Sequence, residues 1–174
     1  KRLDLDEDGP MPVPFPELSL VVFALNEEGC VREVLEEILG FLRENVADYQ
    51  LVFVDDGSTD RTPEIVAEMA AEDPGLELYR HEKNQGIGAA LRTGYSECRK
   101  AWITLLPADG QLAPTELLNL FEKAEGKDIV IANYPRRFET ADNLQRKVLS
   151  RGLRLLTFLC TGVRTPIDGC YLIK

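Results

Sequence analysis

Four short polar clusters, each placed directly after an apolar stretch, contain the residues of this 174-residue chain that could do chemistry. The clusters are NEEG (26–29), DDGSTD (55–60), HEKNQGIG (81–88) and ADGQ (108–111). Any one of them is typical of a turn, because Asp, Asn, Gly and Ser are the residues that turns use. Four together at one edge of one sheet favour a binding site for a polar ligand.

The side chains in these clusters suit a nucleotide. Carboxylates such as Glu27 and Asp56 accept hydrogen bonds from a base N–H or from ribose hydroxyls. Gly86 and Gly88 let the N-terminus of a following helix approach a phosphate closely. The only histidine, His81, is expected to be a structural residue at a strand end rather than a general base.

The fourth cluster offers ligands for a metal ion. Asp109 and Gln111, on the same side of an extended turn, would present two oxygen atoms to a hard divalent cation. Such an ion usually keeps several waters and takes its other ligands from a diphosphate. The pair therefore predicts a site for Mg²⁺ or Mn²⁺ beside the nucleotide.

The elements that must position these clusters alternate along the chain. Short apolar runs predict strands at 18–25, 50–54, 76–80, 103–106 and 128–133. Apolar residues at helical spacing predict helices at 31–42, from residue 63, at 88–99 and at 115–124. The second of these helices is expected to begin with Pro63 and to be capped by Thr62. Such alternation gives right-handed βαβ crossovers and a mostly parallel sheet, with ligands beyond the carboxyl ends of the strands. The expected fold class is therefore α/β.

Composition excludes several functions. The net charge of −10 argues against a general nucleic-acid binder, which needs basic surface to displace counterions from phosphates. The four cysteines contain no CxxC pair, which argues against a zinc site and suits reduced thiols in the cytosol. No apolar run reaches the roughly 18 to 20 residues that span a bilayer, so we expect a chain that is soluble or peripheral.

Composition also divides the chain. Residues 1–17 are acidic and rich in proline, which predicts a disordered tail, and residues 18–174 form one domain. The sequence stops within the apolar, strand-like segment DGCYLIK, and we expect the native domain to continue beyond Lys174.

The segments LVVFALNEE, VFVDDGSTDRT, NQGIGAALRTGY and LPADGQ, in this order and at these separations, resemble the family-two glycosyltransferases of the GT-A fold. The resemblance covers about residues 18 to 174 and is greatest to the branch of dolichyl-phosphate mannose synthase and the polyprenyl-phosphate glycosyltransferases. It implies a GT-A (Rossmann-like) three-layer α/β/α sandwich. It also implies transfer of a sugar from a nucleotide-sugar donor such as GDP-mannose, UDP-glucose or UDP-N-acetylglucosamine.

The resemblance implies roles for particular donor-side residues. Glu27 and Asp56 would hold the nucleotide, and Asp109, the central donor-side residue, would bind Mg²⁺ or Mn²⁺ with support from Gln111.

This sequence departs from the family pattern at three positions. Phe23 and Leu25 stand where the family often has Pro and Tyr, so contacts to the base are expected to differ. Pro107 replaces the first acidic residue of Asp-x-Asp, and proline binds no metal. We therefore expect a stiffened turn and a weakened metal site.

The region after residue 133 reverses the charge of the chain. It gathers six basic residues within about twenty positions, Arg136, Arg137, Arg146, Lys147, Arg151 and Arg154. Arg146, Ser150 and Arg154 recur at i, i+4 and i+8 on one stripe of a predicted helix. Periodicity alone also fits a core helix with a solvated basic face, but the charge reversal favours an anionic partner, either a phosphate group or an acidic membrane surface.

The resemblance assigns this region to the acceptor. It implies that Arg137, or its neighbour Arg136, and Arg146 with Ser150 receive the phosphate of a polyprenyl or dolichyl phosphate at the cytoplasmic face of the membrane. Asp168 corresponds to a shortened Asp-x-x-Gly motif, and it is either an acceptor-side carboxylate or a turn residue.

A lipid phosphate is already an anionic nucleophile, so the reaction needs alignment and stabilisation of the departing diphosphate more than a base. Direct displacement would invert the anomeric centre. Two alternatives remain open. One is a hydroxyl acceptor in polysaccharide or glycolipid synthesis, with Asp168 taking the proton. The other is a non-catalytic nucleotide-sugar binding domain with a degenerate metal site.

Overall fold

The fold is described from a computed structural model over residues 13–132, except 109 and 111, and over residues 171–174. By its internal contacts the chain divides into one unit of residues 1–130 with 171–174 and a second unit of residues 131–170. Of the second unit, the structure describes only Ile131 and Ala132.

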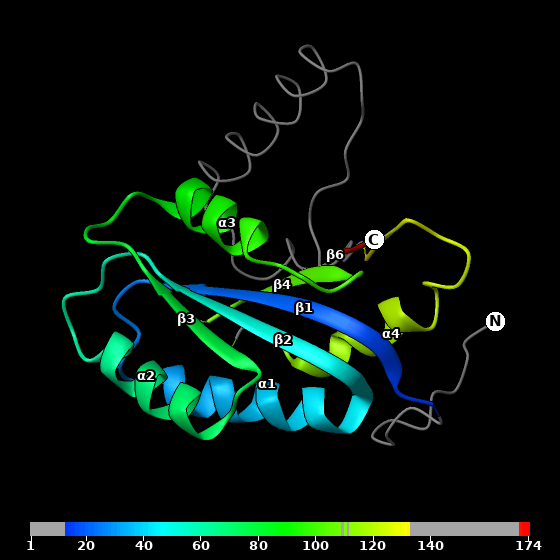
Figure 1. The fold of residues 1–174 in the computed structure, drawn as a ribbon, viewed down its shortest axis with the longest axis horizontal. Coiled ribbons are helices and arrows are strands. Elements are labelled where there is room, and N and C mark those ends of the chain that lie inside the picture. Colours follow the sequence, from blue (N-terminus) through cyan, green and yellow to red (C-terminus); the bar gives the residue numbers. More distant parts are fainter. Residues whose placement is uncertain (1–12, 109, 111, 133–170) are drawn as a thin grey trace, which may run out of the picture. The chain divides into compact units, whose positions relative to one another are not determined.

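Strands and helices alternate through the first unit, as Figure 1 shows. The strands are β1 (Phe15–Ala24), β2 (Val46–Asp55), β3 (Leu76–Arg80), β4 (Ile103–Pro107), β5 (Ile129–Ile131) and β6 (Tyr171–Ile173). The helices are α1 (Val31–Asn45), α2 (Thr62–Glu72), α3 (Ile87–Ser96), the 3₁₀ helix η1 (Pro114–Leu117) and α4 (Leu118–Phe121).

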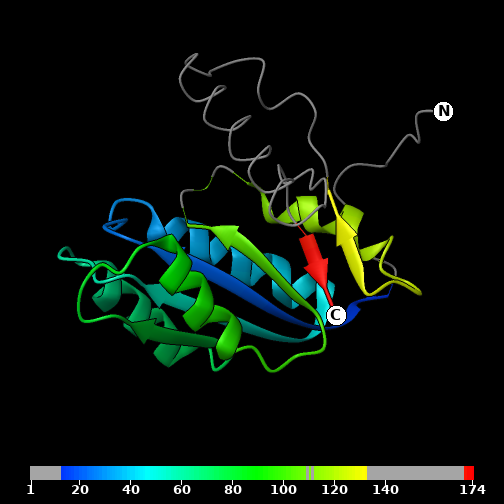
Figure 2. The same cartoon turned by 90° about the horizontal axis from the view of Figure 1, so that it is seen from above.

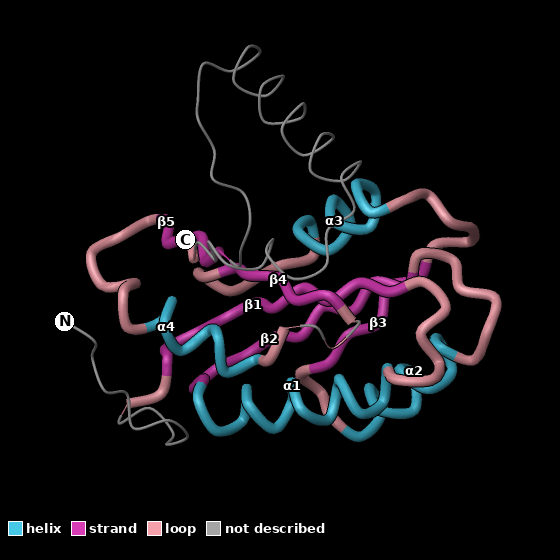
Figure 3. Tube along the Cα trace, turned by 180° about the vertical axis from the view of Figure 1, so that it is seen from behind, coloured by secondary structure: helices cyan, strands magenta, loops and turns pink. Residues whose placement is uncertain are grey.

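The strands form one sheet in the order β3-β2-β1-β4-β6-β5. β1 pairs in parallel with β2 and β4, and β2 pairs in parallel with β3, whereas β6 runs antiparallel to β4. Helices α1 and α2 cover one face and α3 the other, as the views in Figures 2 and 3 also show. The predicted α/β fold with a mostly parallel sheet is therefore confirmed.

The core lies on both faces of β1 and its neighbour β2. Leu20, Val21 and Val22 of β1 are fully buried, and so are Val52 and Phe53 of β2. A strand covered on both faces by helices needs a continuous apolar run rather than alternating apolar and polar residues. This explains the mostly apolar run at residues 18–25. Gly94 of α3 lets that helix lie against Val21, since an added Cβ would be 2.4 Å from Val21 Cγ1.

Several element ends differ from the sequence prediction. β1 begins at Phe15 rather than Leu18, because the buried Phe15 ring stacks on Phe121 with centroids 4.2 Å apart. β2 begins at Val46 rather than residue 50, and the predicted helix at 115–124 is a 3₁₀ turn followed by the short α4. Within the described residues, no helix has the length and apolar character needed to cross a membrane.

Candidate functional site

The carboxyl ends of three neighbouring strands bring the polar clusters together. Ala24 at the end of β1 lies beside Asp55 at the end of β2, and Phe23 lies beside Pro107 at the end of β4. The loops that follow these strands therefore leave the sheet at one edge, as the alternation predicts.

Side chains of the DDGSTD loop and of Thr62, the first residue of α2, bind the backbone of the NEEG loop. The Asn26 amide donates to Ser58 Oγ at 2.8 Å, and the Glu27 amide donates to Thr62 Oγ1 at 2.8 Å. In return, Asn26 Oδ1 accepts from the Thr59 amide at 2.8 Å, with Asn26 at a φ of 58°. These bonds hold the backbone at Asn26 and Glu27, so the Glu27 carboxylate is presented from a fixed loop.

The Thr62 contact corrects one prediction. Thr62 does not cap α2, because its hydroxyl bonds the Glu27 amide and donates to Asp60 Oδ1 at 2.6 Å. Arg61 stands at the cap position, and Asp60 Oδ1 accepts from the Thr62 amide at 3.0 Å. The residue expected to cap the helix is the first residue of α2, and its hydroxyl binds the first loop of the site.

Gly57 brings the loop after β2 against the loop after β3. Its φ is +77°, and a Cβ placed there would lie 2.4 Å from the carbonyl carbon of Lys83. Both the left-handed backbone and the lack of space require glycine at this position.

Asp56 is more enclosed than Glu27, the other carboxylate predicted to hold the nucleotide. Its side chain is about 7% exposed, and its oxygens accept three hydrogen bonds from the loop after β3. Oδ1 accepts from His81 Nδ1 at 2.7 Å and from the Gln85 amide at 3.0 Å, and Oδ2 accepts from the Gly86 amide at 2.8 Å. Burial raises the pKa of Asp56, but the bonds from Gln85, His81 and Gly86 outweigh burial and lower it overall. Asp56 is therefore an anion at neutral pH.

The same bonds alter the expected role of Gly86. Its amide, at the N-terminus of α3, is occupied by Asp56 Oδ2 and by Asn84 Oδ1 at 2.9 Å. The Asp56 carboxylate thus occupies the backbone amide at which the sequence predicted a phosphate.

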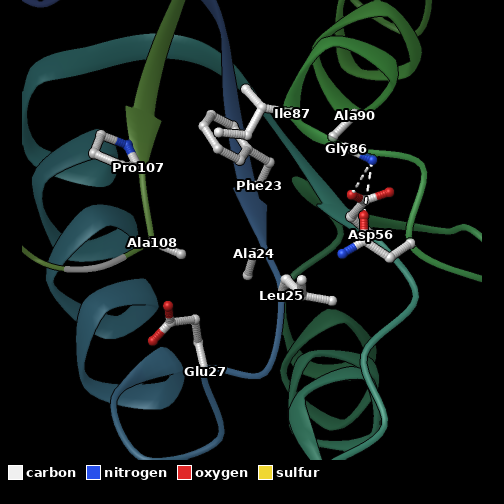
Figure 4. A pocket seen from close by; sticks show the side chains of 11 residues that line it. Phe23, Ala24, Leu25, Glu27, Asp56, Gly86, Ile87, Ala90, Pro107 and Ala108 are labelled. Atoms are coloured by element: carbon white, nitrogen blue, oxygen red, sulfur yellow. Dashed lines mark hydrogen bonds between the residues drawn. The ribbon is translucent and has the colours of Figure 1, made fainter.

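A cavity of about 270 Å³ opens between these loops, and Figure 4 shows the side chains around it. Its polar side chains are Glu27, Asp56 and Asn84. Its remaining lining is apolar or backbone: Phe23, Ala24, Leu25, Gly86, Ile87, Ala90, Pro107 and Ala108. The cavity joins acceptor groups to an apolar wall, which suits a flat heterocycle that donates N–H bonds.

All three departures from the family pattern lie in this cavity. Phe23, Leu25 and Pro107 form part of its apolar wall, with Leu25 37% exposed. Pro107 ends β4 opposite Phe23, so the position that lacks a carboxylate contributes apolar surface to the cavity.

Two contacts at the site were not predicted from the sequence. His81 was expected at a strand end, but its bond to Asp56 has no signal in the local sequence. Cys30 was considered only as a thiol, yet its Sγ lies 3.3 Å from Glu27 Oε2 and orients that carboxylate.

The remaining candidate residues lie outside the described residues. These are Asp109 and Gln111 on the donor side, and Arg136, Arg137, Arg146, Ser150 and Asp168 on the acceptor side. Ala108, the residue before Asp109, lines the cavity. Within the described part of the chain, no three His, Cys, Asp or Glu side chains are grouped as a metal site would need.

The family model described as glycosyl transferase family 2 matches residues 19–172 of the chain. The undecaprenyl-phosphate 4-deoxy-4-formamido-L-arabinose transferase of Pseudomonas fluorescens is 31% identical over 163 residues, covering 92% of this chain and 47% of the relative. A dolichyl-phosphate beta-glucosyltransferase of Trichomonas vaginalis is 32% identical, covering 87% of this chain and 53% of the relative. The chain thus spans about half the length of these relatives.

Two solved structures share the fold. A mannosyltransferase of Pyrobaculum calidifontis, in complex with GDP-Man and Mn²⁺, matches with a TM-score of 0.60 at 21% identity, covering 97% of this chain and 47% of the other. A glucosyl-3-phosphoglycerate synthase of Mycobacterium tuberculosis, in complex with Mn²⁺, UDP-glucose and phosphoglyceric acid, matches with a TM-score of 0.62 at 21% identity, covering 91% and 56%. These likenesses confirm the GT-A fold.

Proposed function

We propose that this chain, which belongs to glycosyl transferase family 2, transfers a sugar from a nucleotide-sugar donor to a polyprenyl or dolichyl phosphate with inversion at the anomeric carbon. Binding of the donor is supported by the cavity at the carboxyl edge of the sheet, where Glu27 and the anionic Asp56 lie among apolar side chains. The proposed acceptor is supported by two relatives at 31% and 32% identity, an undecaprenyl-phosphate and a dolichyl-phosphate glycosyltransferase.

The donor's nucleoside end would occupy the cavity. Asp56 would accept a hydrogen bond from a base N–H, and Glu27 would accept from ribose hydroxyls, because carboxylates only accept. Phe23, Ile87 and Pro107 would cover the base and exclude water from these bonds. Uracil and guanine each present a ring N–H to such an acceptor, whereas adenine offers only its exocyclic amine, so we propose a uracil or guanine nucleotide.

The proposed displacement occurs in one step. An oxygen of the lipid phosphate forms the new bond to the anomeric carbon, and the bond from that carbon to the nucleoside diphosphate breaks with the electron pair leaving on the diphosphate. Because the nucleophile is already anionic, this chain has only to align it and to balance charge. Arg137, with Arg136 as its neighbour, and Arg146 with Ser150 are the residues we propose for the lipid phosphate.

Asp109 and Gln111 are the proposed ligands of a divalent cation, Mg²⁺ or Mn²⁺. Asp56 does not fit the role of a cation ligand, because its oxygens already accept three N–H bonds. Glu27 faces the cavity and has acceptor capacity left. When bound, such a cation neutralises charge on the departing diphosphate.

The acceptor places the reaction at a membrane. Polyprenyl phosphates are membrane lipids, so we propose that this chain works at the cytoplasmic face, with the basic segment 136–154 toward the anionic surface. Its net charge of −10 would otherwise disfavour such a surface.

Calorimetric titration of GDP-mannose, UDP-glucose and UDP-N-acetylglucosamine, each with Mn²⁺ and with a chelator, tests the donor half. We expect metal-dependent binding of one nucleotide, and Asp109→Asn should abolish the metal dependence. Equal affinity with and without chelator would remove Asp109 from a metal site.

Transfer of the labelled sugar to undecaprenyl phosphate, compared with the unphosphorylated alcohol, tests the acceptor half. Product with the phosphate alone is expected, and Arg146→Ala should raise the acceptor KM while donor affinity stays constant. Transfer to the alcohol or to a free sugar would instead place the enzyme among those with hydroxyl acceptors.

A further inference from the structure

We propose that His81 and Thr93 are positioning residues that hold the Asp56 carboxylate so that its Oδ2 atom, rather than Oδ1, receives the N–H of the donor base. This inference rests on the proposed function, because it assigns Asp56 to the nucleotide. From the sequence, His81 was expected to be a structural residue, and Thr93 had no predicted role.

Counting lone pairs separates the two oxygens of Asp56. Each carboxylate oxygen has about two acceptor positions. Oδ1 already accepts from His81 Nδ1 at 2.7 Å and from the Gln85 amide at 3.0 Å, so both of its positions are filled. Oδ2 accepts only from the Gly86 amide at 2.8 Å among the described residues. One acceptor position is therefore left on Oδ2, on a residue that lines the cavity.

Thr93 fixes the histidine that fills Oδ1. A carboxylate accepts and does not donate, so His81 carries a hydrogen on Nδ1. The other ring nitrogen, Nε2, lies 2.9 Å from Thr93 Oγ1 on α3, whose hydroxyl either donates to a neutral ring or accepts from a charged one. The ring is anchored at both nitrogens, and its side chain is about 9% exposed, so it has little freedom to turn.

The chain of contacts links three walls of the cavity. Asp56 follows β2, His81 follows β3, and Thr93 lies on α3, whose residues Ile87 and Ala90 line the cavity. The ring therefore holds the acceptor atom at a fixed place relative to the apolar wall. Without it, Oδ1 would have an unfilled position, and the carboxylate could offer either oxygen to the base.

Two substitutions at His81 separate this role from simple packing. The Nδ2 of asparagine reaches the place of Nδ1, so His81→Asn keeps a donor for Asp56. Glutamine reaches the place of Nε2, so His81→Gln keeps the contact to Thr93 but loses the bond to Asp56. The two variants have similar polarity, and each serves as the control for the other.

The measurement is titration of purified variants with the nucleotide sugar that the unaltered protein binds, together with steady-state kinetics. We expect His81→Gln to weaken donor binding about 10-fold, with kcat at saturating donor unchanged, and His81→Asn to stay within about threefold. Thr93→Val should weaken binding about threefold, and Thr93→Ser should restore it. In an Asp56→Asn background, His81→Gln should cost nothing further, since the bond no longer positions a carboxylate.

The outcomes are separable. If His81→Gln and His81→Asn bind donor as the unaltered protein does, or weaken it equally, the positioning role is wrong while the proposed function stands. If the unaltered protein binds no nucleotide sugar, the proposed function fails and this inference fails with it. Should His81→Gln prove too unstable to purify, the Thr93→Val and Thr93→Ser pair decides, and equal affinity in both would overturn the proposal.

Discussion

Two buried aspartates at opposite ends of the sheet have much in common. Asp56 follows β2 at the carboxyl edge, and Asp73 follows α2 and precedes β3 at the amino edge. They are 5% and 4% exposed, and the pKa of each is lowered because hydrogen bonds to the ionised carboxylate outweigh burial. Each also borders a hollow in the surface. Burial, pKa and the presence of a hollow therefore do not distinguish a binding carboxylate from a structural one.

The partners distinguish them. Asp73 accepts from Arg43 Nη2 at 2.6 Å, from Tyr49 Oη at 2.9 Å and from the Gly75 amide at 2.8 Å. The Arg43 guanidinium compensates its charge, and both oxygens are filled. Asp56 is held by amides and an imidazole, with no Arg or Lys ion pair among the described residues, so its charge still faces the cavity. A carboxylate that remains uncompensated is available to a ligand.

Glycine substitution at each end gives the largest expected effect. Gly57→Ala should destabilise the protein by about 3 kcal/mol or more, since it requires a strained φ and meets the backbone of Lys83. Gly75→Ala should cost about 1–2 kcal/mol, because the added Cβ meets only side chains, the ring of Tyr49 at 2.4 Å and Asp73 Oδ1 at 3.0 Å. Urea unfolding measures both.

Gly40→Ala in α1 is the control, with nothing within 4 Å of the added Cβ, and it should stabilise by about 0.5–1 kcal/mol. If Gly57→Ala were as mild as Gly75→Ala, the close approach of the two site loops would be wrong.

Removing the charge of each aspartate is the next test. Asp56→Asn should weaken donor binding about 10- to 100-fold, the equivalent of a hydrogen bond to a charged group. Asp73→Asn should lower the free energy of unfolding by about 1–3 kcal/mol and leave donor affinity unchanged. Calorimetry and urea unfolding on both variants would sharpen the comparison. Loss of donor affinity in Asp73→Asn alone would reverse the assignment of the two ends.

Acid unfolding should show the smallest effect. A carboxylate with a lowered pKa contributes stability above its unfolded value, here 3.8, and loses it as pH falls through the lower folded value. We expect the unaltered protein to lose stability below about pH 3.8, and Asp73→Asn to show a shallower decline, by about 1.4 kcal/mol for each unit of pKa shift removed. Circular dichroism during acid titration measures the slope. Parallel curves for the two proteins would contradict the lowered pKa of Asp73.

Much of the fold followed from local pattern. Continuous apolar runs predicted β1 to β5, because a strand buried on both faces has apolar residues at consecutive positions. Helical spacing predicted α1 to α3, because an amphipathic helix has apolar residues every three or four positions. Element ends were predicted less well. The ring that extends β1, Phe15, depends on Phe121, more than a hundred residues away.

The sequence by itself determined which residues stand at the binding edge, because chain order and parallel pairing place Glu27 and Asp56 beyond their strands. Only the tertiary structure decided what each polar group binds. Thr62 bonds the Glu27 amide, His81 bonds Asp56 from 25 residues away, and Asp56 rather than a ligand occupies the Gly86 amide. Hydrogen bonds form between groups that are close in space. The local sequence does not specify the distances between loops that come together only when the chain folds.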